Sequence, residues 1–116
     1  MLEKHVEAYF KKRVEEIGGR TYKFTSPANR GVADRIACLP DGSTWFVEIK
    51  TIGGTISPLQ RVFGAEMHRL KQNYTILWSK EEVDDMFNAW KEDSKEDLEE
   101  EEKKREEIDP DLRDKK

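Results

Sequence analysis

Three charged residues stand at the ends of two apolar segments, where they could do chemistry together. Asp34 opens the segment that runs to Leu39, and Glu48 and Lys50 close the segment that begins at Thr44. Two carboxylates that converge inside a sheet repel each other unless a cation lies between them. Oxygen ligands from Asp and Glu, without clusters of histidine or thiol groups, suit Mg²⁺ or Mn²⁺ rather than zinc. We therefore expect a divalent-metal site.

The alternative without a functional role is that Glu48 and Lys50 form an ordinary solvent-facing ion pair on an exposed strand. Their neighbours Phe46, Val47 and Ile49 make that strand apolar enough to lie inside a sheet. Charge that is not compensated there costs several kcal/mol. The context therefore favours a functional site.

A hairpin would bring these charges together only with a particular turn. The segment Pro-Asp-Gly-Ser separates the two strands and has turn chemistry. Opposed residues in a hairpin have position numbers of constant sum, and Asp34 faces Glu48 or Lys50 only if that sum is 82 or 84. A two-residue turn at Asp41 and Gly42 gives 83 and points Asp34 away. The site therefore requires an odd-length loop or a bulge.

The rest of the pattern supplies the elements that must hold this hairpin. Apolar residues at three- and four-residue steps predict an amphipathic helix over residues 2–17. Alternation of polar and apolar residues predicts a half-buried strand over 20–24, and turn-forming residues predict a surface loop after it. The predicted order is α-β-β-β-α-β, with the second helix starting near residue 58, the last strand at 74–78 and a final helix from residue 83.

The second helix and the last strand carry more specific expectations. Ser57, Pro58 and Gln60 have the spacing of an N-cap, a first-turn proline and a capping box. Residues 74–78 lack charge, so we expect an interior strand. The helix is expected to bury its apolar side chains, namely Leu59, Val62, Phe63, Met67 and Leu70.

Charge divides the chain into a folded domain, residues 1–90, and a tail, residues 91–116. The tail holds 13 acidic and 8 basic residues, whereas the domain holds 12 acidic and 13 basic residues. We expect the tail to be a charged, solvated helix or a disordered segment. The mildly basic domain suits a partner that carries phosphate.

Composition also restricts the compartment. Cys38, as the single cysteine, cannot form an intramolecular disulfide, which favours a reducing compartment. The N-terminus is too charged for a signal peptide, and no apolar run approaches the roughly 20 residues of a membrane span. We expect a cytoplasmic protein without membrane contact.

Several blocks of sequence in one order resemble a known nuclease superfamily. KFTSPANRGVAD, PDGSTWFVEIKT and GGTISPLQ are similar to the PD-(D/E)xK superfamily, and more narrowly to the virus-type replication-repair nuclease domain in its short standalone phage or bacterial form. The resemblance covers about residues 3–80. It implies a restriction-endonuclease-like αβββαβ core, an α/β fold with a mixed central sheet flanked by helices, here followed by a charged C-terminal helix. Ala33 departs from the proline that the family usually has.

This resemblance also implies roles for individual residues. Asp34 and Glu48 match the two metal-binding carboxylates, and the backbone carbonyl of Ile49 would be a further metal ligand. Lys50 would orient or help to deprotonate the attacking water and oppose charge on the phosphate. We favour the electrostatic role, because a lysine among carboxylates tends to stay protonated.

The family also carries a glutamate on its first helix, in an E-x-x-V/I context that Glu3 and Val6 match. On a helical wheel Glu3 falls inside the apolar sector and Glu7 falls at its border. Glu3 is therefore the predicted helix carboxylate, with Glu7 as the alternative. Both could instead complement the positive helix N-terminus.

Gln60 and four basic residues complete the predicted site. Gln60 could serve the capping box alone, but the family places a glutamine beside its active site here, and the two roles can coexist. Each basic side chain could contact DNA phosphates or could be a solvated surface group. These side chains are Lys23, Arg30, Arg35 and Arg61.

Together these features predict a Mg²⁺- or Mn²⁺-dependent DNA endonuclease that hydrolyses phosphodiester bonds. By the family resemblance its substrate would be branched DNA, such as four-way junctions or flaps, in a bacterial or phage-infected cytoplasm. A homodimer would let two sites cut opposite strands, and no organic cofactor is expected. The alternatives are a non-catalytic DNA-binding module of the same fold and an assembly or adaptor protein that acts through the acidic C-terminal helix.

Overall fold

The computed structural model describes residues 2–91 and residue 103. The predicted charged tail therefore lies almost wholly outside the described residues. The chain divides into two units, Met1–Val83 and Asp84–Lys116. Within the described residues no helix is long and apolar enough to cross a membrane. The elements are α1 (Glu3–Glu16), β1 (Arg20–Lys23), β2 (Arg35–Cys38), β3 (Thr44–Ile49), α2 (Pro58–Arg69) and β4 (Asn73–Leu77), and residues 80–91 are also helical.

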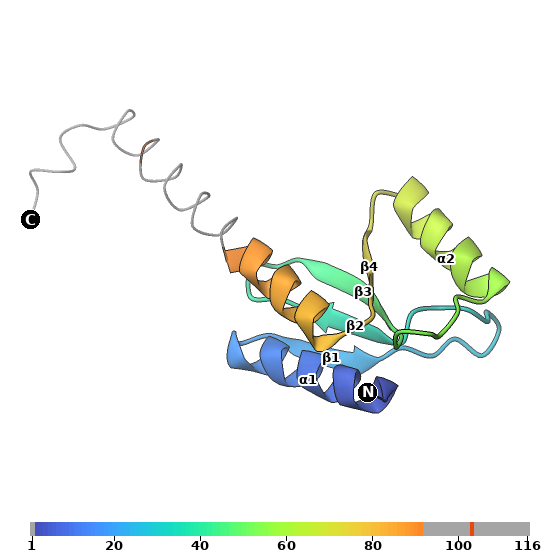
Figure 1. Ribbon diagram of the computed structural model, residues 1–116. Helices are drawn as coiled ribbons and strands as arrows, with labels where there is room; N and C mark the ends of the chain where they lie inside the picture. The colour runs from blue at the N-terminus through green and yellow to red at the C-terminus, as the bar shows by residue number, and fades with distance from the viewer. Residues whose placement is uncertain (1, 92–102, 104–116) are drawn as a thin grey trace, which may run out of the picture. The chain divides into compact units, whose positions relative to one another are not determined.

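Among the described residues, four strands form one mixed sheet in the order β1-β2-β3-β4 (Figure 1). The β1–β2 and β2–β3 pairs are antiparallel, and β3–β4 is parallel. This confirms the predicted element order and mixed sheet. The expectation of an interior last strand is wrong, because β4 pairs within this sheet with β3 alone. Its uncharged residues are covered in part instead, since Leu77 is 3% exposed and Tyr74, Thr75 and Ile76 are half-buried.

The turn between β2 and β3 is of the kind that the site requires. Opposed residues of the two strands have position numbers that sum to 82 throughout. The N–H of Leu39 donates to the Ser43 carbonyl, and the N–H of Gly42 donates to the Leu39 carbonyl. Gly42 has a φ of 89°, as expected for a three-residue loop that closes through a left-handed glycine. The odd-length loop is confirmed, and it continues the register to Asp34 opposite Glu48.

The first helix covers one face of the sheet and contains much of the core. It packs against β1 and β3. Val6, Phe10 and Val14 recur at four-residue steps and are each no more than 1% exposed. These steps place the three side chains on one face of the helix. Val47, on β3, is also fully buried.

The second helix packs against β4 and covers the opposite face less completely. It has no fully buried residue. Leu59, Val62 and Leu70 are 50%, 65% and 46% exposed, so the expectation that they are buried is wrong. The helix meets the sheet mainly through Phe63, whose ring packs edge-on against the rings of Phe46 and Tyr74 at centroid distances of 5.9 and 5.8 Å. Helical spacing identified an apolar face, but it could not specify how much of that face meets the sheet.

Candidate active site

Asp34 lies just before β2, at the end of the sheet where β3 finishes. Its Oδ2 accepts a hydrogen bond of 2.8 Å from the backbone N–H of Ile49. Its carbonyl accepts a second bond, of 3.0 Å, from the N–H of Phe24. The first bond holds the aspartate against β3, the strand that carries Glu48, as the hairpin register requires, and the second ties it to the residue that follows β1.

Glu48 is the most unusual group in this region, because it is a carboxylate only 1% exposed. Burial, followed by the negative charge of Asp34, raises its pKa from 4.5 to about 8, while Lys50 acts in the opposite direction. The Lys50 ammonium lies 3.9 Å from Glu48 Oε1. Within the described part of the chain, Glu48 Oε2 is buried and has no hydrogen-bond partner. A proton shared with Asp34, or a cation, would relieve this arrangement.

Gln60 completes the predicted capping box and its side chain also contacts Glu48, while its role in the reaction stays a prediction. Its Oε1 accepts a hydrogen bond from the N–H of Ser57, and its own N–H donates to Ser57 Oγ, which completes the capping box of α2. The remaining end of the same amide, Nε2, donates to Glu48 Oε1 at 2.9 Å. Because Ser57 fixes the orientation of the amide, the first turn of α2 presents a donor to the buried carboxylate.

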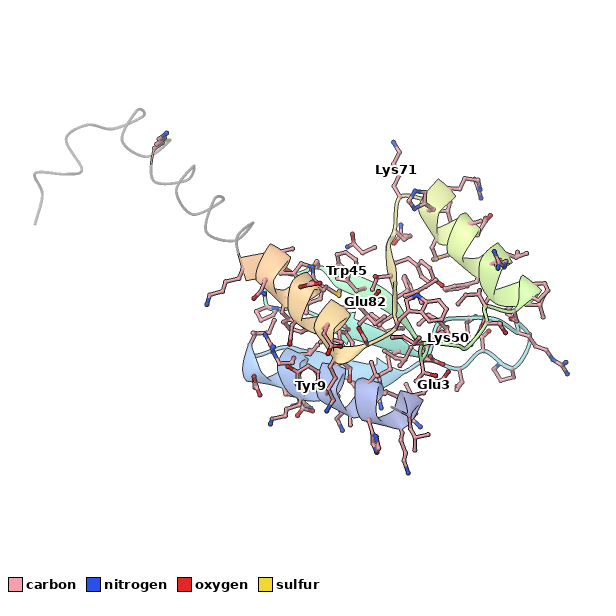
Figure 2. The ribbon with its side chains drawn as sticks, viewed as in Figure 1. Glu3, Tyr9, Trp45, Lys50, Lys71 and Glu82 are labelled. Atoms are coloured by element: carbon pink, nitrogen blue, oxygen red, sulfur yellow. The ribbon has the colours of Figure 1, made fainter. Side chains whose placement is uncertain are left out.

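The two candidate glutamates of α1 have different surroundings. Glu7 pairs with Arg35 at 2.7 Å, so its charge is already compensated. Glu3 lies near enough to Glu48 for its charge to contribute, as the weakest cause, to the raised pKa of Glu48. Figure 2 shows Glu3 and Lys50 at the same region of the molecule. Glu3 therefore stays the predicted helix carboxylate, and Glu7 has a structural partner.

The four residues that were predicted to contact DNA also differ in their surroundings. The Arg35 side chain is only 12% exposed and bonds Glu7 and the hydroxyl of Thr21, at 2.7 and 3.2 Å. The assignment of Arg35 to DNA stays a prediction, but its strand position directs it to the α1 face and into an ion pair, which favours a structural role. Lys23, Arg30 and Arg61 are exposed, and their assignment stays a prediction. Arg30 lines a hollow of about 600 Å³ between its loop and α2.

The described residues supply two close carboxylates for a metal, and no three of their His, Cys, Asp and Glu side chains form a complete metal-binding group. Magnesium is often held by one or two carboxylates and keeps several waters beside substrate phosphates. Asp34 and Glu48 fit that requirement, because no donor in the described part of the chain satisfies Oε2 of Glu48, and a bound cation would satisfy it. The carbonyl of Ile49 and the carboxylate of Glu3 remain predicted additional ligands.

Tyr74 is a member of this neighbourhood that the sequence did not reveal. Burial, followed by the charges of Glu48 and Asp34, raises its pKa to about 12. It lies opposite Phe46 in the parallel β3–β4 register, on the same face as Glu48. Only the pairing of β4 with β3 places it there, and a parallel register cannot be derived from local sequence.

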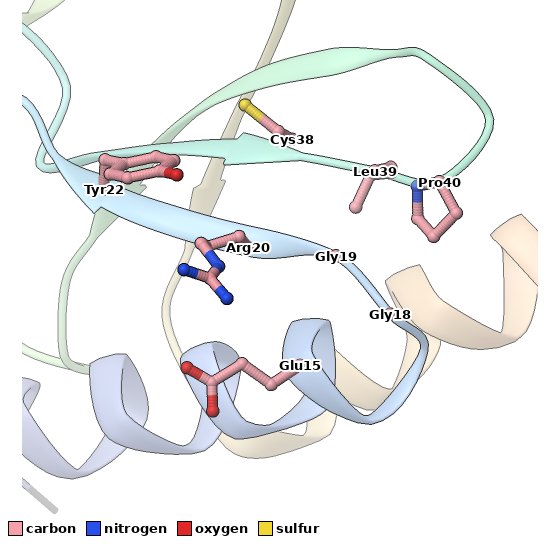
Figure 3. Close-up of a pocket in the computed structure, with 8 residues that line it drawn as sticks. All are labelled: Glu15, Gly18, Gly19, Arg20, Tyr22, Cys38, Leu39 and Pro40. Atoms are coloured by element: carbon pink, nitrogen blue, oxygen red, sulfur yellow. The ribbon is translucent and has the colours of Figure 1, made fainter.

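The other end of β2 has a different character. There a hollow of about 650 Å³ is lined by residues that include Glu15, Arg20, Tyr22 and Cys38 (Figure 3). Its lining contains a single carboxylate, and an arginine accompanies it. The paired carboxylates and the lysine all lie at the opposite end of the strands, which identifies that end as the candidate active site.

Comparisons with known proteins agree with this geometry. No protein-family model matches the sequence. The chain is 38% identical over 79 residues to "Putative nuclease p44" of Acyrthosiphon pisum secondary endosymbiont phage 1, an alignment that covers 68% of this chain and 85% of the phage protein. A solved structure described as a VRR_NUC domain superposes with a TM-score of 0.71 and 29% identity, over 74% of this chain and 94% of that structure.

These likenesses define the class as nucleases with a restriction-endonuclease-like α/β fold. Within that class, the chain belongs to the virus-type replication-repair nuclease (VRR-NUC) family. The predicted family and fold are thereby confirmed.

Proposed function

We propose that this protein is a Mg²⁺- or Mn²⁺-dependent endonuclease that hydrolyses phosphodiester bonds in branched DNA. One observation carries the proposal: among the residues that the structure describes, no donor reaches the buried oxygen Oε2 of Glu48, which lies beside the carboxylate of Asp34. A purely structural carboxylate at this depth would be expected to have its oxygens satisfied. A pair of carboxylates that hold a divalent cation explains both the burial and the missing donor.

Each residue of the candidate active site has a distinct proposed role. Asp34 and Glu48 would hold the cation, with Ile49 and Glu3 as further ligands. The amide of Gln60 keeps Glu48 oriented, and the Lys50 ammonium, 3.9 Å from Glu48, opposes the negative charge of the phosphate. A bound divalent ion supplies an acidified water and stabilises charge on the phosphate and the departing oxygen.

Exposed basic side chains support nucleic acid as the partner. Lys23 and Arg61 are exposed, and Arg30 lines the hollow beside α2. Phosphate contacts of this kind give affinity without sequence preference, so DNA structure would determine selectivity. A homodimer would place two sites on opposite strands of a junction.

The direct test uses labelled four-way junction, flap and duplex DNA, each with Mg²⁺ and with chelator. We expect metal-dependent cutting of a branched substrate by the wild type and a loss of at least about 100-fold in Asp34→Ala, because the cation loses a ligand. Asp41→Ala is the matched control, since Asp41 is an exposed aspartate in the hairpin loop. Equal cutting by Asp34→Ala and the control would reject the assignment.

A second variant separates a nuclease from a DNA-binding module. Lys50→Ala should lose cutting but keep its affinity for the same junction, measured by fluorescence anisotropy, because one charge contributes little to total phosphate binding. A wild type that binds junctions but never cuts them with Mg²⁺ or Mn²⁺ would favour the binding module. Deletion of residues 91–116 tests the adaptor alternative, which predicts loss of function with the catalytic carboxylates intact.

A further inference from the structure

Gly31, in the loop between β1 and β2, lies against the first turn of α2. It has a φ of +84°, a backbone conformation that favours glycine. A Cβ at this position would lie 2.5 Å from the carbonyl carbon of Leu59, 2.6 Å from its oxygen and 2.8 Å from the backbone nitrogen of Gln60. All three atoms belong to the backbone of α2, so no side-chain rotation could make room.

Gly42 shows what a left-handed glycine looks like without such a contact. Its φ of +89° nearly equals that of Gly31, but a Cβ there would meet no atom of the described residues within 4 Å. Glycine at position 42 therefore serves the backbone conformation alone. At position 31 it serves both the conformation and a close approach between a loop and a helix.

This approach joins the two segments that flank the buried carboxylate. Gly31 stands three residues before Asp34, whose Oδ2 is bonded to the N–H of Ile49. On the other side of the contact is Gln60, whose Nε2 donates to Glu48 Oε1. The contact thus lies between the segment that carries Asp34 and the helix that carries Gln60.

We propose that Gly31 is a positioning residue for the reaction, and that its missing side chain sets the spacing between Asp34 and Gln60 around Glu48. The inference rests on the proposed nuclease function for its kinetic consequence. The spacing itself is a property of the folded chain, so it can be measured independently of cutting.

The kinetic test compares Gly31→Ala and Gly31→Asn with Gly42→Ala and Gly42→Asn. Asparagine tolerates a positive φ better than alanine does, so the Asn pair isolates the crowding by the Cβ. With branched DNA and Mg²⁺, we expect kcat to fall about 100-fold in both Gly31 variants with KM changed less than about threefold, as a displacement near 1 Å can produce. The Gly42 variants should keep kcat within about twofold.

A double-mutant cycle shows whether Gly31 acts through the helix. Gly31→Ala should reduce kcat much less in a Gln60→Ala background than in the wild type, because part of what it displaces is already absent. Fully independent losses would show that Gly31 does not act through Gln60 and would overturn the proposal. So would a Gly31 variant that cuts as well as the matched Gly42 variant.

An activity-independent measurement keeps this inference separate from the proposed function. The side-chain amide resonances of Gln60 report its hydrogen bond to Glu48, and they should move toward free-amide positions in the Gly31 variants but not in the Gly42 variants. If the wild type cuts no DNA but these resonances move, the nuclease assignment fails, while the spacing that Gly31 sets around Glu48 stands. Unchanged resonances would reject the positioning role. So would Gly31 variants whose circular dichroism shows no folded state at any temperature.

Discussion

The two helices of the sheet offer a comparison, because similar apolar spacing leads to different outcomes. Helix α1 places Val6, Phe10 and Val14 in the core, whereas α2 buries no residue completely and leaves Leu59 and Val62 half exposed or more. Burial of apolar area is the main stabilising contribution in a domain of this size. The α1 face therefore contributes more to stability, and the α2 face carries the candidate chemistry.

The α2 face also carries an energetic cost. Glu48 is buried beside Asp34, so ionisation of both carboxylates brings two like charges together, and the positive charge of Lys50, 3.9 Å from Glu48, compensates them in part. Uncompensated buried charge destabilises a fold. We infer that the sheet tolerates this cost on the α2 side because the α1 side is packed without a comparable cost.

The largest effect that would test this comparison is expected for Phe10→Ala. The ring of Phe10 is fully buried, and its removal leaves a cavity that should cost about 3–5 kcal/mol of unfolding free energy. Urea denaturation followed by circular dichroism measures this loss. A cost below about 1 kcal/mol would show that the α1 face does not dominate stability.

The next effect concerns Glu48 in the absence of metal. The pKa of Glu48 is raised from 4.5 to about 8. Between pH 4.5 and pH 8, the native state therefore keeps a proton on Glu48 that the unfolded state has already released. The contribution of Glu48 to the free energy of unfolding should therefore be largest below pH 4.5. This contribution should be lost as the pH rises through 8, a loss on the order of a few kcal/mol.

Glu48→Gln is the matched variant for this measurement. It should lose this part of the pH dependence and should exceed the wild type in stability at pH 8 with chelator, while losing cutting activity. Added Mg²⁺ should stabilise the wild type at pH 8 and leave Glu48→Gln nearly unchanged. Parallel pH profiles for the two proteins would contradict the raised pKa.

A smaller effect is expected at Arg35, which belongs to the α1 face. Arg35→Met should cost about 1–3 kcal/mol, because Glu7 and Thr21 lose a partly buried charged partner. Its affinity for junction DNA should change less than about twofold. Arg61→Met is the control with the opposite pattern: unchanged stability and weaker, less salt-sensitive DNA binding. The reverse pattern would show that Arg35 contacts DNA.

The smallest effect is expected at Val62, on the exposed face of α2. Val62→Ser should change the unfolding free energy by less than about 0.5 kcal/mol, since the side chain is 65% exposed. Thermal unfolding of the two proteins under the same buffer conditions provides the measurement. A large loss would show that α2 is packed more tightly than its exposure indicates.

The structural features that could be predicted from the sequence depend on local patterns of residues. Periodicity gave the element order, and the alternation of side chains along a strand predicted that Asp34 meets Glu48 only with an odd-length loop. The spacing of Ser57 and Gln60 gave the capping box. Each of these features depends on residues close together in the chain or on a single turn.

The features that sequence could not supply depend on contacts between distant segments. The pairing of Arg35 with Glu7 requires the position of α1 on the sheet, and the location of Tyr74 requires the parallel β3–β4 register. The close approach of Gly31 to Leu59 is likewise a contact between separate segments. Apolar spacing in α2 identified a face but not its partner, so its exposure was missed.

The shared amide of Gln60 has a thermal consequence. One end of it caps α2 and the other holds Glu48, and α2 has no fully buried side chain to anchor that turn. Local opening of weakly anchored elements requires less free energy than global unfolding. Warming should therefore inactivate the enzyme reversibly below its melting temperature, as the first turn of α2 frays and releases the carboxylate while the remainder of the sheet stays folded.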